Sequence, residues 1–282
     1  MYIMKILEFV VAILFLCFLL SLFVSSIVDM YSNISNRKGK HLKKMLAKIL
    51  DDNGTKEWVN QLYNHPLISS LSYSNKRLTS YIPSKVFSLA LSDLRDKNKG
   101  LMNGSNLSQV IELLDKETED HQSFLESIDT WYNEYMFRVN HAYKRLLRTP
   151  MWVVAFAIAI VFNIDAVKVG TTLWQNATMA NNIAIEAESY VKNNSVNDTA
   201  SVRLSDFEKY KSDFDLPIGW KFEKAYYKSI KDTKDFSLSW YIIIKLLGLF
   251  ITAMIASMGA PFWYDILQKI IGVKGSLKPK KE

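Results

Sequence analysis

The sequence predicts an all-α membrane protein with three transmembrane helices, a helical cytoplasmic domain and a smaller helical outer domain. Three observations lead to this fold class. The chain of 282 residues is 49% hydrophobic, but its apolar residues are concentrated in three blocks, each long enough to cross a bilayer. Tryptophans mark the ends of the second and third blocks. The polar segments between the blocks show helical periodicity and no strand pattern.

The first apolar block runs from Phe9 to Val28 and contains no charged residue. Its 20 residues span about 30 Å as a helix, which is one hydrocarbon thickness. The apolar region of a signal peptide is shorter and follows a more basic start. We therefore expect residues 1–29 to form an uncleaved N-terminal transmembrane helix.

The other two blocks are bounded by pairs of tryptophans at about one membrane thickness. Trp152 and Trp174 lie 22 residues apart, and Trp240 and Trp263 lie 23 apart, or about 33 and 35 Å along a helix. Indole rings favour the headgroup level of a bilayer, so the spacing indicates aromatic belts. We expect transmembrane helices over 151–170 and 239–265. Because the following segment lacks proline, we expect the second of them to continue well beyond the membrane.

The distribution of cations predicts the orientation. Residues 30–150 hold 18 Lys/Arg and 13 Asp/Glu, whereas residues 171–238 hold nine and ten. The tail 266–282 adds five lysines. Cations near membrane ends stay cytoplasmic, so the N-terminus and 171–238 are expected outside, and 30–150 and the tail inside. The net charge of +7 is explained by this pattern, and no RNA- or DNA-binding signature accompanies it, so we expect no nucleic-acid partner.

The cytoplasmic domain, residues 30–150, is expected to be helical. Leu42, Met45, Leu46 and Ile49 follow the i, i+3, i+4, i+7 spacing of one helix face. Helices are expected over 41–50, 56–65, 84–94, 107–120 and 123–147, with a polar loop at 97–106. The last of these helices leads into the second transmembrane segment.

The outer segment, residues 171–238, is expected to contain a polar turn at 193–199, a helix over 202–214 and a turn at 216–220. The turn contains both Pro217 and Gly219.

Five strings, in order along nearly the whole chain, resemble a family of uncharacterised bacterial inner-membrane proteins. They are YNHPLI with SYIPSKVF, then WY…M…RV…YKR, FNID, LPIGW and GAPFWYD. The chain departs from the family at Asn140-His141-Ala142, where Ser-Gly-Trp is expected, and at Thr79, where proline is expected. The resemblance implies a bacterial inner membrane, an outer domain in the periplasm and three membrane helices. It implies no reaction.

One amide and three charged side chains lie within the second and third apolar blocks: Asn163, Asp165, Lys168 and Lys245. Charges inside a bilayer are costly and face protein or water. Measured from the tryptophan pairs, Asp165 and Lys245 lie at depths about 7 Å apart, within the reach of a lysine side chain. We expect them to pair between helices, with Lys168 as a competitor for Asp165. The pair has two interpretations, a structural contact that fixes helix register or part of an ion or proton path.

Small residues recur every four positions in the first and third blocks, where Ser21, Ser25, Ala256 and Ala260 are candidates for close helix packing. Such stripes serve contacts within one chain or between copies, and we expect a homo-oligomer. Near the inner end of the third block, Pro261 is expected to bend the helix. Trp263 and Asp265 beside it are candidates for an interfacial anchor or a docking point.

Catalytic and cofactor motifs are absent from the sequence. The four histidines are far apart, the single cysteine excludes a cysteine-based metal site, and no phosphate-binding or dinucleotide-binding motif occurs. We expect no enzyme, no cofactor and no metal. The expected role is a non-enzymatic, oligomeric inner-membrane anchor or effector that couples a cytoplasmic protein partner or signal to the membrane, in a setting such as stress or phage defence. The alternative is a channel or transporter using the intramembrane polar residues.

Overall fold

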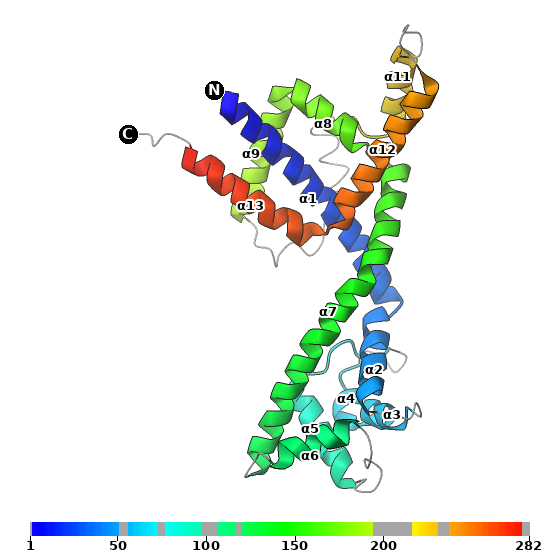
Figure 1. Ribbon diagram of the computed structural model, residues 1–282, viewed down its shortest axis with the longest axis vertical. Helices are drawn as coiled ribbons and strands as arrows, with labels where there is room; N and C mark the ends of the chain where they lie inside the picture. The colour runs from blue at the N-terminus through cyan, green and yellow to red at the C-terminus, as the bar shows by residue number, and fades with distance from the viewer. Residues whose placement is uncertain are drawn as a thin grey trace. The chain divides into compact units, whose positions relative to one another are not determined.

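The computed structural model describes residues 2–50, 56–72, 77–97, 106–116, 120–193, 216–230 and 237–277. All regular secondary structure in these ranges is helical (Figure 1). The chain divides into two compact units. The first unit comprises Met1–Met30 and Leu147–Glu282, and the second comprises Tyr31–Leu146.

The first unit is built around the N-terminal helix. Its helices are α1 (Tyr2–Ile34) up to Met30, the end of α7 (His121–Val161), α8 (Ala166–Gln175), α9 (Ala177–Asn193), α11 (Trp220–Ile230), α12 (Leu238–Ser257) and α13 (Ala260–Leu277). Phe15 and Phe18 of α1 are fully buried. The ring centroid of Phe18 lies 5.4 Å from that of Tyr190 on α9 and 5.6 Å from that of Tyr264 on α13. Helices α9 and α13 therefore pack directly against α1, as Figure 1 shows.

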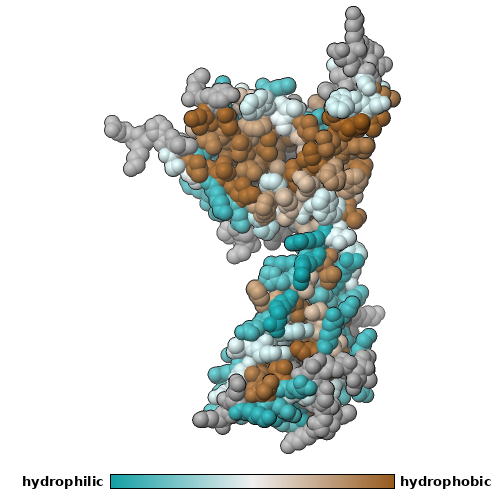
Figure 2. Space-filling view, viewed as in Figure 1, coloured by the Kyte–Doolittle hydropathy of each residue, from teal (hydrophilic) through white to brown (hydrophobic). Residues whose placement is uncertain are grey.

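Two of these helices, α1 and α12, are long and apolar enough to cross a membrane. Helices α7 and α8 would form a third span if the pair is counted as one, although it bends by 60° at its break. Apolar side chains of α12 such as Ile243, Leu246 and Phe250 are exposed. Figure 2 shows a broad apolar surface on the first unit. An apolar surface of this extent is expected of a protein that contacts lipid. The helices indicate a membrane protein.

The second unit has its own core. It contains the end of α1, α2 (Arg37–Leu50), α3 (Glu57–Asn64), α4 (Pro66–Ser69), α5 (Ser84–Lys97), α6 (Asn106–Lys116) and the first part of α7. The ring of Phe87 on α5 stacks on Tyr132 of α7 at 4.1 Å, and the Tyr132 hydroxyl donates to the carbonyl of Ile82 at 3.2 Å. Leu42 and Leu46 of α2 are buried in the same core. The α2 face expected from periodicity is thus the buried one, with Met45 and Ile49 partly covered.

The expectation of one continuous second helix beyond residue 170 is wrong. α7 ends at Val161, the chain is not helical over 162–165, and α8 begins at the next residue. A second interruption at Asn176 separates α8 from α9. The first break occurs at polar residues that cap the helix ends, a signal that proline and glycine counting does not detect.

The expected third helix over 239–265 is interrupted, and part of the tail 266–282 is helical. α12 ends at Ser257, and Gly259 has φ of 91°, a conformation open to glycine. Pro261 lies in the first turn of α13, where its missing N–H costs nothing, so glycine rather than proline ends the helix. Residues 260–277 form α13, and its Lys274 pairs with Glu188 of α9 at 2.8 Å.

Some expected elements fall on residues outside the described ranges. These are the helix over 202–214, most of the turn at 193–199, most of the loop at 97–106 and the last residues of the tail, 278–282.

Candidate functional site: a buried ionic network at the break between α7 and α8

The residue types at the break explain why one helix ends and the next begins. Asn163 has a left-handed backbone conformation with φ of 50°, which asparagine adopts more readily than most residues. The N–H of Ile164 donates to the carbonyl of Ala159 at 2.9 Å. Asp165 is extended and caps α8, where its Oδ1 accepts the N–H groups of Val167 at 3.0 Å and Lys168 at 3.2 Å.

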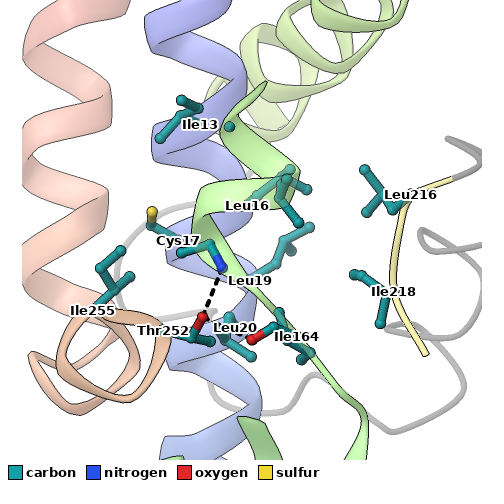
Figure 3. Close-up of a pocket in the computed structure, with 13 residues that line it drawn as sticks. Ile13, Leu16, Cys17, Leu19, Leu20, Ile164, Leu216, Ile218, Thr252 and Ile255 are labelled. Atoms are coloured by element: carbon teal, nitrogen blue, oxygen red, sulfur yellow. Dashed lines mark hydrogen bonds between the residues drawn. The ribbon is translucent and has the colours of Figure 1, made fainter. Parts of the chain in front are cut away.

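Thr252 of α12 joins the two sides of the break. Its hydroxyl accepts the N–H of Ala166 at 2.9 Å, the contact drawn as a dashed line in Figure 3. The same hydroxyl lies 2.8 Å from the carbonyl oxygens of both Ile164 and Gly248, either of which can accept its proton. Thr252 is only 1% exposed. One side chain thus satisfies backbone groups that the break removes from regular helix bonding.

Gly248, one turn earlier on α12, makes room for Asp165. A Cβ at position 248 would lie 2.6 Å from Cγ of Asp165, and closer still to its Oδ1. The Asp165 carboxylate therefore occupies the space that any other residue at 248 would fill, and α12 passes the break at close range.

Two carboxylates and two ammonium groups meet beside this contact, and we call Asp165, Lys168, Glu223 and Lys245 the ionic network. Lys245 Nζ lies 2.8 Å from Glu223 Oε2 and 3.5 Å from Asp165 Oδ2. Lys168 Nζ lies 2.7 Å from both Glu223 oxygens. The Tyr241 hydroxyl donates to Glu223 Oε1. The formal charges of the network sum to zero, so its burial leaves no net charge at this place.

Glu223 is positioned by the start of α11. Gly219 has φ of 110°, accepts the N–H of Glu223 and precedes the helix that begins at Trp220. The Trp220 indole N–H donates to the carbonyl of Val161 at the end of α7, at 3.2 Å. The Asn163 amide donates to Gly219 O and to Glu223 Oε2, both at 3.2 Å. The break residue Asn163 and the turn residue Gly219 thus place Glu223 against the lysines.

The network is almost closed to solvent. Side-chain exposures are 1% for Asp165, 9% for Glu223, 12% for Lys245 and 14% for Lys168. Burial by itself would raise the pKa of Glu223, but hydrogen bonds from Lys168, Lys245 and Tyr241 outweigh it and lower that pKa from 4.5 to about 2. All four carboxylate oxygens accept hydrogen bonds, so the network is suited to holding α8, α11 and α12 together rather than to proton abstraction.

An apolar pocket of about 100 Å³ lies on the α1 side of the break (Figure 3). Cys17, the single cysteine of the chain, lines it from α1, together with Ile164 of the break and Ile255 of α12. Leu216 and Ile218 line it from the segment before α11. Because its lining is almost entirely apolar, this pocket does not extend the ionic network into a polar path.

The structure brings all four predicted intramembrane residues, Asn163, Asp165, Lys168 and Lys245, into one cluster. Asp165 and Lys245 form the expected contact, whereas the Lys168 ammonium contacts Glu223.

The remaining predicted residues lie away from this cluster. Pro261 and Asp265 are exposed on α13, and the Trp263 indole donates to the carbonyl of Ile255 at 2.8 Å. Ser21, Ala256 and Ala260 are buried within the chain, and Ser25 is half-buried. The Ser21 hydroxyl donates to the carbonyl of Ile255 at 3.2 Å. Because Ser21 joins α1 to α12 and three of these four residues are buried inside one chain, they do not argue for contacts between copies.

Sequence reasoning missed Glu223, Tyr241 and Gly248. Glu223 lies among lysines in the string WKFEKAYYK, which reads as a solvated helix face. The available signal was the Leu-Pro-Ile-Gly-Trp turn directly before it, since a positive-φ glycine fixes where the next helix begins. The apolar blocks also hold two lysines but only one aspartate. Because buried charges are usually paired, this imbalance indicated that a second carboxylate lies nearby.

Within the described ranges, no group of three or more His, Cys, Asp or Glu side chains is arranged to hold a metal ion. No family model, curated protein or solved structure matches the chain.

Proposed function

We propose that this protein is a non-enzymatic membrane anchor or effector subunit that couples a cytoplasmic partner or signal, received by the second unit, to the first unit. One observation carries the proposal. Helix α7 runs through 41 residues from the core of the second unit to the break beside the ionic network.

The buried side chains at the start of α7 fasten it to the second unit, where Phe124, Ile128 and Tyr132 contribute to the core. At its other end, the carbonyl of Val161 is held by Trp220. Pro150 removes the backbone bond to Leu146, so the helix can bend there while it still transmits rotation and axial displacement. A force on α7 therefore acts on Asn163, the residue that the ionic network fixes in a left-handed conformation.

The proposed location is a bacterial inner membrane, with the second unit on the cytoplasmic side. Support comes from the cations that follow α1 and precede the apolar part of α7, including Arg37, Lys38, Arg145 and Arg148. The absence of enzymatic activity is likewise a proposal, supported by the mutual neutralisation of the charges in the network. Self-association stays part of the proposal, and native mass spectrometry in nanodiscs tests it.

Cys17 allows a direct test of coupling, because it is the only thiol and lies in the first unit. The rate of its alkylation by a membrane-permeant maleimide is measured for the full chain in nanodiscs. Phe87→Ala weakens the packing of α7 in the core of the second unit, because the Phe87 ring stacks on Tyr132 of α7. Ile68→Ala is the matched control, a buried residue of α4 in the same core.

Coupling predicts that Phe87→Ala changes the Cys17 alkylation rate at least about threefold, whereas Ile68→Ala leaves it near the wild-type rate. A Cys17 rate that is the same in wild type, Phe87→Ala and Ile68→Ala contradicts the proposal. Circular dichroism serves to check that both variants retain their helices.

The four charges in and beside the apolar helices favour a channel or transporter as the second candidate. Ion leakage from liposomes that contain the protein distinguishes the two functions. If the protein is an anchor, liposomes that contain wild type or Asp165→Asn should leak ions no faster than empty liposomes. Leakage that Asp165→Asn alters would favour the second candidate and overturn the first.

A further inference from the structure

One face of α2 in the second unit carries a row of lysines. Lys40, Lys43, Lys44 and Lys48 are spaced i, i+3, i+4 and i+8 and therefore lie on the same side of the helix. The opposite side is buried, because Leu42, Leu46 and Leu50 belong to the core. Packing thus fixes the direction in which the lysines point. Lys56, directly before α3, adds a fifth ammonium group to the same place.

These five lysines surround a cavity of about 570 Å³, which we call the lysine pocket. The volume is within the range of about 300–1,000 Å³ that is typical of small-molecule sites. Its other described lining residues are Ala47, Val59, Asn60 and Leu78, so none of them is acidic. Among the described residues, no carboxylate forms an ion pair with any of the five lysines.

The wall of the lysine pocket beside Leu78 is built by specific contacts. In the amide orientation that satisfies both groups, Asn36 accepts the N–H of Leu78 at 2.7 Å and donates to its carbonyl at 3.2 Å. Gly39 permits this approach, because a Cβ at position 39 would lie 2.6 Å from the carbonyl oxygen of Leu78. The segment at Leu78 is therefore held against the N-terminus of the lysine-bearing helix.

The arrangement opposes the stability of α2. Like charges three and four residues apart repel each other on a helix. Arg37, Lys38 and Lys40 also lie near the N-terminus of α2, where the helix macrodipole is already positive. An anion in the pocket would relieve both effects, and the positive helix end would add to its attraction.

The number of charges indicates the chemistry of the anion. A phosphate group carries about −1.5 to −2 charges at neutral pH, so two or three of them balance five lysines within a small volume. Carboxylates would have to number five to do the same. Lysine ammonium groups bind phosphate as point charges, and Val59, Ala47 and Leu78 offer an apolar wall to the remainder of a ligand.

We propose that the lysine pocket binds a phosphate-bearing ligand. The phosphate belongs either to a free oligophosphate compound or to phospholipid headgroups, and both present the same chemistry to the lysines. This binding is separate from the coupling proposed above and is measured without reference to Cys17.

The test is calorimetric titration of inorganic tripolyphosphate into the full chain in phosphatidylcholine nanodiscs, which carry no net lipid charge. The pocket variant is Lys43→Gln, Lys44→Gln and Lys48→Gln together. The matched control removes three exposed lysines elsewhere in the second unit, Lys85→Gln, Lys116→Gln and Lys144→Gln. Because both variants lose three charges, they differ only in where the charges were.

Each exposed ionic contact contributes a factor of about two to five in affinity, so the dissociation constant should rise about tenfold or more in the pocket variant and stay within about twofold in the control. The melting temperature of the unliganded pocket variant should equal or exceed that of wild type, because the repulsion on α2 is reduced. Equal dissociation constants in both variants, or no binding of tripolyphosphate to wild type, would overturn the proposal.

A second titration identifies the source of the phosphate. In nanodiscs with phosphatidylglycerol, headgroups that occupy the lysine pocket compete with tripolyphosphate, and its apparent affinity for wild type falls relative to phosphatidylcholine discs. A free ligand as the natural occupant predicts an affinity that the lipid does not change at matched ionic strength. Each outcome supports the phosphate site and assigns its occupant.

Discussion

The Asp165 carboxylate occupies the place of a side chain at Gly248, since a Cβ there would lie 2.6 Å from Asp165 Cγ. This relationship ties the cap of α8 to the backbone of α12 and brings Asp165 to Lys245. Four predictions follow from the geometry around it.

Gly248→Ala should displace Asp165 and weaken the cap of α8. Overpacking of a buried contact together with loss of a cap should lower the free energy of unfolding by about 2–4 kcal/mol. Thermal unfolding in nanodiscs, followed by tryptophan fluorescence, measures the change. Gly272→Ala on α13 is the control, because a Cβ there meets no atom within 4 Å beyond the neighbouring backbone of its own helix, and it should be neutral or stabilising by up to about 1 kcal/mol.

Glu223→Gln should destabilise the first unit strongly, because Lys168 and Lys245 would lose their shared carboxylate. Breaking a buried ion pair at one partner costs about 3–5 kcal/mol. Glu186→Gln, at an exposed position of α9, should stay within about 0.5 kcal/mol. Adding Lys168→Met to Glu223→Gln should recover part of the loss, and a double variant that is less stable than Glu223→Gln would argue against charge pairing as the cause.

Acid should destabilise the wild-type protein through Glu223. Its pKa is lowered from 4.5 to about 2 by folding, so its contribution is complete above pH 4.5 and is lost as the pH falls from there through 2. The contribution is on the order of 3 kcal/mol. The stability difference between wild type and Glu223→Gln should shrink over this window, and a difference that is constant between pH 6 and pH 2 would exclude the mechanism.

Thr252→Val keeps the shape of the side chain but removes the hydroxyl that bonds Ala166 N–H and Ile164 O. An unpaired buried N–H should cost about 1–3 kcal/mol, measured by thermal unfolding. Thr171→Val, at an exposed position of α8, is the matched control and should cost less than about 0.5 kcal/mol. Equal losses in both variants would show that the hydroxyl of Thr252 is not specifically required.

Patterns within one segment predicted much of the helical content. The apolar stripe of Leu42 and Leu46 identified the buried face of α2, because a helix displays its core residues at regular spacing. Asp165 and Lys245 were identified as partners because charges in apolar segments are costly and depth along a helix can be counted.

Features set by pairing between distant segments could not be read in this way. Glu223 joins the ionic network only because the turn at Gly219 and the amide of Asn163 direct it there, and its own surroundings in the sequence are polar. The sequence also did not reveal that Gly248 lies against Asp165, since a glycine in an apolar helix carries no signal of what approaches it. Asn163 and Asp165 were recognised as polar residues in an apolar block. The sequence did not reveal that Asn163 ends α7 in a left-handed conformation or that Asp165 caps α8.

The ionic network has a consequence for the synthesis of the chain. Lys168 is made 55 residues before Glu223, and Asp165 is made 80 residues before Lys245. During translation the segment at the break is therefore made before the partners of its charges exist. If α7 and α8 insert together as a span, this order predicts that α8 inserts stably only once α11 and α12 are made, and that a nascent chain ending before Lys245 is retained or degraded. Completion of the network would then be a late step in the assembly of the first unit.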